Sequence, residues 1–211
     1  MFPTLPDRKT ARPRERILLT AHALFYRHGI RSTGIDRVIA ESEVAKVTFY
    51  RHFPSKHDLI LAYLEARHQL WMAWFTDALR RHATTPRDPL NAIVPALGEW
   101  ICAEAYQGCA FINAVGEFRE TLPGVVTIAR RHKQAMTDAI AELIPASEDR
   151  QRQAQALALA LDGAMVRAQL DDSPEIALQS LQQLIDALRA DRQQPASPLV
   201  AAKHLAPRRK R

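Results

Sequence analysis

The sequence predicts an all-α protein of about nine helices. Along almost the whole chain, apolar residues recur at the three- and four-residue spacing of an amphipathic helix. No run of alternating apolar and polar residues is long enough to indicate a sheet. With 211 residues, 47% of them hydrophobic, the chain can bury a substantial core. We find no stretch of about 18 uncharged apolar residues and no signal-peptide pattern, so we expect a cytoplasmic protein.

Three short helices are expected at the N-terminus. The first covers residues 12–28 and ends at Gly29, the residue type that most easily closes a helix. The second covers residues 33–41, and we expect the Thr33 hydroxyl to cap its free amide groups. The third covers residues 45–52 and is closed by the following Phe-Pro pair.

Longer helices follow, each with its own start or stop signal. Ser55 and Asp58 form a capping box that opens a helix reaching about residue 82. Asp88 and a following proline open the next helix, which we expect to be kinked at Pro95 and to end near Glu104. The remaining expected helices cover residues 109–120, 125–144, 148–170 and 174–190. Residues 191–211 are expected to form a basic, disordered tail.

Charge is distributed unevenly along the chain. Residues 1–60 carry 11 Lys/Arg and 6 Asp/Glu, residues 61–190 carry 12 and 16, and residues 191–211 carry 6 and 1. A basic N-terminal third is suited to a polyanion such as nucleic acid, although a solvated charged surface would have the same composition.

The second and third expected helices, joined by a short turn, have the arrangement of a helix-turn-helix, whose second helix enters the DNA major groove. Val44, Phe49 and Phe53 fall near one face and can hold the third helix against the first two. Lys56 begins the following helix, where free amides favour a phosphate. The remaining side chains of this helix are free to contact DNA, and several of them can form hydrogen bonds with bases or phosphates. They are Lys46, Val47, Thr48, Tyr50, Arg51 and His52. From these residues alone, an amphipathic helix inside a helical bundle is an equally good interpretation.

A family resemblance favours the DNA-binding interpretation. Residues 14–65, and above all Thr48-Phe-Tyr-Arg-His-Phe-Pro-Ser-Lys56, resemble the DNA-binding domain of TetR-family (tetracycline repressor-like) transcriptional regulators. The resemblance implies a homodimer that reads a palindromic operator and a divergent C-terminal domain that binds a small ligand. By position it also implies groove contacts by Lys46, Val47, Thr48, Tyr50 and His52, and phosphate contacts by Thr33 and Lys56.

Three residues depart from the family pattern. Glu43 stands in the turn where a glycine is usual, so the residue best suited to a positive φ is missing. Ala45 replaces the common capping serine of the third helix, at a cost of about 1 kcal/mol. Val47 replaces a small residue on the reading face and could contact a thymine methyl group.

Residues 66–190 resemble the family less closely, in the segment from Gly108 to Ala114 and at Glu117-Phe118. Large apolar side chains there could line a ligand cavity, with Asn113, Glu117 or His132 as polar anchors, although each could equally fill an ordinary core. The candidate lining residues are Trp71, Trp74, Phe75, Trp100, Asn113, Phe111, Glu117, Phe118, Met136 and Met165. The last two helices carry a broad apolar stripe, which predicts dimerisation through them, with an internal core as the alternative.

The sequence thus predicts a DNA-binding domain over residues 1–54, a ligand-binding and dimerisation domain over residues 55–190, and the tail. We expect a ligand-responsive transcriptional regulator that acts as a repressor. It would bind double-stranded operator DNA and leave it when a small, largely apolar organic ligand binds. The alternative is a helical small-molecule carrier or docking protein that does not touch DNA. Enzyme motifs, phosphate-binding glycine loops and histidine or cysteine spacings for metal are missing from the sequence, so we expect no catalysis, cofactor, metal or membrane partner.

Overall fold

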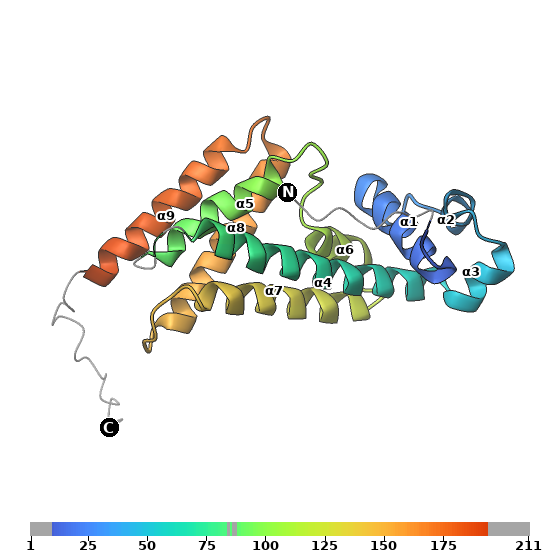
Figure 1. Cartoon of the computed structure of the whole chain (residues 1–211), viewed down its shortest axis with the longest axis horizontal. Helices are drawn as coiled ribbons and strands as arrows, with labels where there is room; N and C mark the ends of the chain where they lie inside the picture. Colours follow the sequence, from blue (N-terminus) through green and yellow to red (C-terminus); the bar gives the residue numbers. More distant parts are fainter. Residues whose placement is uncertain (1–9, 84, 86–87, 194–211) are drawn as a thin grey trace, which may run out of the picture.

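The computed structural model describes residues 10–83, 85 and 88–193, with side chains described up to residue 190. This part of the chain contains nine α-helices, one short 3-10 helix and no strand. The predicted all-α class is therefore confirmed. The molecule is elongated, with a small group of helices at one end and a larger bundle forming the rest (Figure 1).

The small group, here called the head, consists of α1 (Pro13–His28), α2 (Ile35–Ser42) and α3 (Lys46–His52). Its core contains Ile17 and Phe25 from α1, Val38 from α2, and Phe49 from α3. Gly29 ends α1 as predicted, with a positive φ of 84° that a residue with a Cβ rarely adopts.

The head is followed directly by α4 (Lys56–His82). This long helix begins at the head and runs along the rest of the molecule (Figure 1). The predicted Ser55 cap is present: its hydroxyl accepts a hydrogen bond from the Asp58 backbone N–H at 3.1 Å and donates to the Asp58 carboxylate at 2.7 Å. With 27 residues, α4 spans about 40 Å at 1.5 Å per residue. Because α1 of the head and α7 both pack on α4, a movement of α4 would change the packing of both helices.

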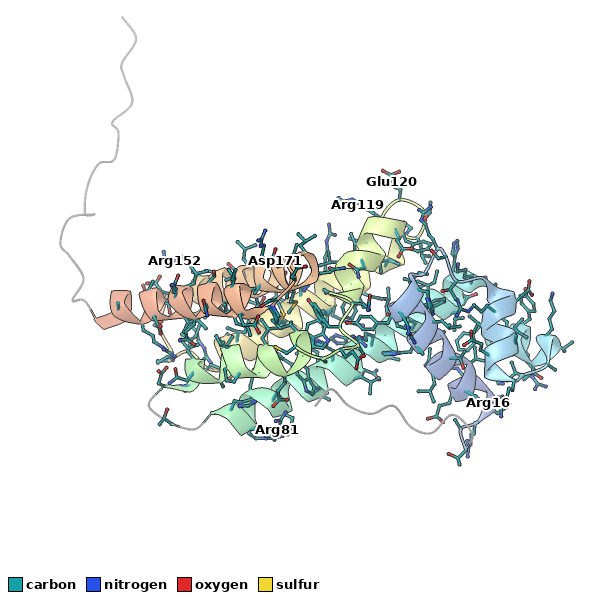
Figure 2. The ribbon with its side chains drawn as sticks, turned by 90° about the horizontal axis from the view of Figure 1, so that it is seen from above. Arg16, Arg81, Arg119, Glu120, Arg152 and Asp171 are labelled. Carbon is teal, nitrogen blue, oxygen red and sulfur yellow. The ribbon has the colours of Figure 1, made fainter. Side chains whose placement is uncertain are left out.

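The remaining helices and α4 are here called the body. They surround the larger part of the apolar core, which is continuous with the core of the head. Besides α4, they are α5 (Ile93–Ile101), α6 (Ala110–Phe118), α7 (Gly124–Ala141), α8 (Arg150–Leu170) and α9 (Glu175–Gln193). Helix α7 packs against α4, α6 and α8, and α8 packs against α9. Figure 2 places Arg119 and Glu120, at the end of α6, on the side of the body that adjoins the head.

The predicted boundaries of several helices were wrong. A 3-10 turn (Pro89–Ala92) precedes α5, which begins at Ile93 and ends at Ile101 rather than near Glu104. Pro95 therefore lies in the first turn of α5, where its missing N–H leaves no helical hydrogen bond unmade, so no kink is needed. At the other end, α9 continues to Gln193 beyond the predicted limit of 190, and the rest of the predicted tail lies outside the described residues.

Candidate DNA-binding and effector sites

The turn between α2 and α3 is made by a residue in a left-handed conformation. Glu43 has φ 53° and ψ 41°, and it is the one non-glycine residue with positive φ in the described chain. Such a conformation costs an L-residue about 1–2 kcal/mol. The Arg16 guanidinium of α1 donates a hydrogen bond to the Glu43 carbonyl oxygen at 3.1 Å and so helps hold the turn in place.

Helix α3 has an inner and an outer face. Phe49 and the following Phe53 are fully buried, and Phe53 also lies under the Arg14 guanidinium, 5.3 Å from its ring centre. On the outer face, the Val47 side chain is 81% exposed and Tyr50 is 40% exposed. The other outward residues are Lys46 and Arg51, which are exposed, and Thr48 and His52, which are half-buried.

Lys46 has an acidic neighbour on the preceding helix. Its ammonium lies 3.6 Å from a carboxylate oxygen of Asp36, and both side chains are largely exposed. An exposed pair of this kind contributes little, about 0–1 kcal/mol, and it leaves Lys46 able to move to a phosphate. Ala45 precedes α3 without a side-chain cap, in agreement with the sequence.

The prediction for Thr33 was wrong. Gly34, not Thr33, precedes α2, and the Thr33 hydroxyl donates to the Gly29 carbonyl oxygen at 2.8 Å instead of accepting from the helix amides. Thr33 is fully buried, so its hydroxyl ties the end of α1 to the start of α2 and presents no group to a phosphate.

A carboxylate of the body holds the loop between α1 and α2. The Glu117 carboxylate, on α6, accepts hydrogen bonds from the backbone N–H of Arg31 at 2.7 Å and of Ile30 at 3.4 Å. In return, Arg31 Nε donates to the Glu117 backbone oxygen at 3.0 Å, and its guanidinium lies 5.2 Å from the ring centre of Phe118. We call this set the Arg31–Glu117 contact.

The start of α4 is attached to the same loop. Lys56 Nζ donates to the Arg31 carbonyl oxygen at 3.4 Å. Partial burial lowers the pKa of Lys56, the nearby Glu117 opposes that shift, and Arg31 adds to it. The residue predicted to contact a phosphate is thus also tied to the body through the Arg31–Glu117 contact.

A second contact joins the head to the segment just before α6. The Tyr26 hydroxyl, on α1, donates to the Gly108 carbonyl oxygen at 3.0 Å and accepts from the Gln107 backbone N–H at 3.1 Å. Gly108 has a positive φ of 79°, which explains a glycine in this segment. Helix α6 is therefore attached to the head at both of its ends.

Aromatic side chains fill the centre of the body. The Trp71 ring stacks on Phe75 with ring centres 4.6 Å apart and meets Trp100 edge to face at 5.5 Å. The Phe111 ring of α6 stacks on His132 of α7 at 3.7 Å. The space between these rings has no room for a water molecule in this conformation.

Four of the ten predicted ligand residues border that space. They are Trp71, Trp100, Phe111 and Met165. Trp74, Phe75, Phe118 and Met136 are buried elsewhere in the same core. Asn113 donates a hydrogen bond to the Gln107 backbone oxygen, and the Glu117 carboxylate accepts one from the Arg31 backbone N–H. In this conformation both residues therefore bind other parts of the protein.

Sequence reasoning missed three residues at this space: Arg67, Cys109 and Ala110. His132, one of the three predicted polar anchors, does border it. Arg67 is only 2% exposed, its Nη1 lies 3.1 Å from His22 Nε2, and its guanidinium lies 4.1 Å from the Tyr26 ring centre. Its position one helical turn before Trp71, on the apolar face of α4, was the available signal.

Two open pockets lie between the head and the body. One, of about 470 Å³, is lined by α1 residues including His22 and Tyr26 and by the segment after α5, including Glu104. The second, of about 420 Å³, lies between Tyr26, Tyr63 and α6 and includes Asn113 and Glu117. No group of three or more metal-ligating side chains occurs in the described residues, and none of their helices is apolar over a length sufficient to cross a lipid bilayer.

Comparison with known proteins gives a consistent result. Residues 17–63 match the family described as bacterial regulatory proteins, tetR family. A TetR-family transcriptional regulator from Streptomyces coelicolor is 34% identical, with a TM-score of 0.74 over 85% of this chain and 95% of that chain. A putative TetR transcriptional regulator from Streptomyces avermitilis is 28% identical, with a TM-score of 0.69 over 84% and 98%.

Curated relatives match over a shorter length. An uncharacterised HTH-type transcriptional regulator of Mycobacterium tuberculosis is 32% identical over 54% of this chain and 50% of its own. The HTH-type transcriptional activator FasR of Mycolicibacterium smegmatis is 30% identical over 62% of this chain and 58% of its own. The match thus spans about half the length of these curated relatives.

The helix-turn-helix geometry, the family match and the structural likeness over 85% of the chain favour a regulator over a carrier or an enzyme. With 34% identity over nearly the whole of a solved TetR-family regulator, the chain belongs to the TetR family of transcriptional regulators.

Proposed function

We propose that this regulator is a repressor that binds a palindromic operator as a homodimer and leaves it when a small, largely apolar organic ligand binds. In this proposal, residues 1–54 read DNA and residues 55–190 bind the ligand and the second protomer. The observation that carries it is the outer face of α3, where an 81% exposed valine stands among basic and hydroxyl side chains. An exposed apolar side chain on a basic helix is suited to a thymine methyl group.

The proposed DNA contacts follow from side-chain chemistry. Lys46 and Arg51 would bind phosphates or guanine, Thr48 a base edge or a phosphate, and Tyr50 a phosphate. His52 and Lys56 complete the surface at the end of α3 and the start of α4. Thr33 is omitted because its hydroxyl is buried and bonded to Gly29.

The exposed apolar residues of the body support a dimer through α8 and α9. In the described chain, five of the eight large apolar side chains that are exposed belong to these two helices: Leu159, Val166, Leu170, Ile176 and Leu184. Apolar surface gathered in this way marks an interaction site, and a two-fold interface would bury it. A two-fold axis can set the two α3 helices one DNA turn, about 34–36 Å, apart.

The two attachments of α6 to the head support control by a ligand. A ligand entering the aromatic centre beside Trp71, Trp100 and Phe111 would need room, and Phe111 lies on α6. Displacement of α6 would disturb the Tyr26 and Arg31–Glu117 contacts, and with them the orientation of α3. Ligand and operator would then bind different conformations and compete through one equilibrium.

The test of DNA binding uses operator selected from random duplex DNA and fluorescence anisotropy at several salt concentrations. We expect a palindromic sequence, and we expect Lys46→Ala combined with Tyr50→Ala to weaken binding strongly and to reduce the salt slope by about 1 for each phosphate that the variant no longer binds. Arg80→Ala removes an exposed charge in the last turn of α4, at the opposite end of that helix from α3, and should leave binding unchanged. Equal affinity of the double variant and the wild type would contradict the proposed surface.

The direction of regulation needs a separate measurement, because the relative FasR is named as an activator. We expect a bound dimer to occlude the promoter, so in vitro transcription from the selected operator should fall when protein is added. An increase in transcript would show activation and leave the DNA contacts unaffected.

A further inference from the structure

Two buried donors border the aromatic centre of the body. Trp71 is 1% exposed, and its indole Nε1 has no hydrogen-bond acceptor among the described residues. Arg67, one helical turn earlier on α4, lines the same space, and its charge contributes to the lowered pKa of His132 in the wall of that space. A buried N–H without an acceptor costs about 1–3 kcal/mol, so its persistence at a candidate ligand site calls for an explanation.

We propose that the effector is an organic carboxylate whose charged group binds Arg67 and the Trp71 N–H while its apolar part lies against Trp100, Phe111 and Met165. This inference rests on the proposed effector site and names the chemical class that the site would take. A guanidinium and an indole N–H both donate, and a carboxylate accepts from both.

The charged groups that act on His132 in the wall of this space are cationic, although the part of the chain that contains it is acidic. Residues 61–190 carry 16 Asp/Glu and 12 Lys/Arg, yet Arg67 is buried in their core. Burial lowers the pKa of His132 to about 2, with Lys133, His68 and Arg67 contributing in the same direction. Burial also lowers the pKa of His22 to about 3, and Arg67 adds to that shift. Both imidazoles are therefore neutral at pH 7, so a bound anion would be attracted by the arginine without further protonation.

The walls favour an apolar body for the ligand. Trp71, Trp100, Phe111 and Met165 present rings and a thioether, and Arg67 supplies the fixed charge. Because the space has no room for water in this conformation, a ligand must separate the Phe111 and His132 rings to enter. An alkyl or aryl carboxylate can offset that loss by burying apolar surface, whereas a small inorganic anion cannot.

The experiment compares carboxylates with neutral molecules of the same shape. The probes are octanoate and phenylacetate, each paired with its primary amide, and the readout is intrinsic tryptophan fluorescence with no DNA present. All three tryptophans of the chain lie in this aromatic cluster, so a ligand there changes their emission. We expect at least one carboxylate to bind tenfold or more tightly than its amide. If no carboxylate binds more tightly than its amide, the inference is wrong.

Variants locate the preference. Arg67→Met should reduce the ratio of carboxylate to amide affinity to about one, and Arg67→Lys should retain part of it. Arg131→Met removes an exposed arginine of α7 and should keep the wild-type ratio. A ratio that survives Arg67→Met, or one that is lost equally in Arg131→Met, would overturn the assignment to Arg67.

A second variant covers the case in which Arg67→Met does not fold, as judged by far-ultraviolet circular dichroism. Trp71→Phe keeps a ring but removes the N–H, and it should weaken carboxylate binding several-fold with little effect on the amide. Trp74 and Trp100 remain as reporters. Unchanged carboxylate affinity in a folded Trp71→Phe protein would contradict the role of the N–H. A carboxylate that binds as expected without changing operator affinity would support this inference and contradict the proposed control by effector.

Discussion

Replacing Glu117 with glutamine tests whether the body holds the loop between α1 and α2. The side chain keeps its length and shape but loses its charge. In the structure its carboxylate accepts the Arg31 N–H at 2.7 Å, a length typical of charge-assisted bonds, while the 3.4 Å bond from Ile30 is long and contributes less. We therefore expect the change to act mainly at the Arg31 amide.

The size of the effect can be worked out from one bond. A hydrogen bond to a charged group is worth about 1.5–3 kcal/mol, and the exposed setting of Arg31 favours the lower limit. At about 1.4 kcal/mol per factor of ten, the loop should open about ten times more often. Amide hydrogen exchange measures this opening directly, so peptides covering residues 29–33 should exchange about tenfold faster in Glu117→Gln.

The matched control is Glu120→Gln, which removes an exposed carboxylate just beyond the end of α6 (Figure 2). It should leave exchange at residues 29–33 unchanged. Wild-type exchange rates there in Glu117→Gln would show that the Arg31–Glu117 contact does not stabilise the loop, and equal acceleration in both variants would attribute the effect to net charge. Operator affinity of the same two variants then shows whether the loop is linked to DNA binding.

Three further predictions concern stability, each measured as the free energy of unfolding in urea. Glu43→Gly should stabilise the protein by about 1 kcal/mol, because glycine adopts the observed positive φ without steric cost; destabilisation would mean that the glutamate side chain has a compensating contact. Ala45→Ser should add about 1 kcal/mol by capping α3, and Ala45→Val, which cannot cap, is its control. Burial lowers the pKa of His22 to about 3 and of His132 to about 2, so between those values and about 6.5 the unfolded chain binds more protons than the folded one. Stability should be complete above pH 6.5 and decrease by about 1.4 kcal/mol per histidine and pH unit below it, and a flat profile from pH 7.5 to 5.5 in wild type would contradict the burial argument.

Local signals predicted the helices well because the physics of a helix end is local. Gly29 and Ser55 act through their own conformation or through an amide three residues away, and both have the predicted role. The prediction for Thr33 was wrong because two local hydrogen bonds were open to its hydroxyl, one to the following helix amides and one to the preceding Gly29 carbonyl. In the structure, where α1 packs against α2, the hydroxyl donates to the carbonyl.

The contacts between head and body could not be predicted in this way. Glu117 and Arg31 are 86 residues apart, so no periodicity or capping rule relates them. Glu117 was predicted as a polar anchor for a ligand, in a segment that resembles the TetR family. That prediction could not supply its partner Arg31, because the contact between them depends on how α6 packs against the head.

The attachments at the two ends of α6 constrain any mechanism that uses this helix. Phe111 and Glu117 are six residues apart, about 9 Å along the axis, so one nine-residue helix contacts the aromatic centre and the head at once. A helix of this length moves as a rigid unit, and a shift that makes room beside Phe111 must be absorbed at Gly108, at Glu117 or at both. Gly108 can absorb rotation because it is a glycine at positive φ, whereas Glu117 is held by several directional hydrogen bonds. Movement should therefore pivot near Gly108 and reach the head through Glu117. Alanine at position 108 would be strained at φ 79° and its Cβ would clash with the Gln169 side chain, so Gly108→Ala should displace this end of α6. Amide hydrogen exchange at residues 29–33 in that variant would then measure whether the displacement reaches the Arg31–Glu117 contact.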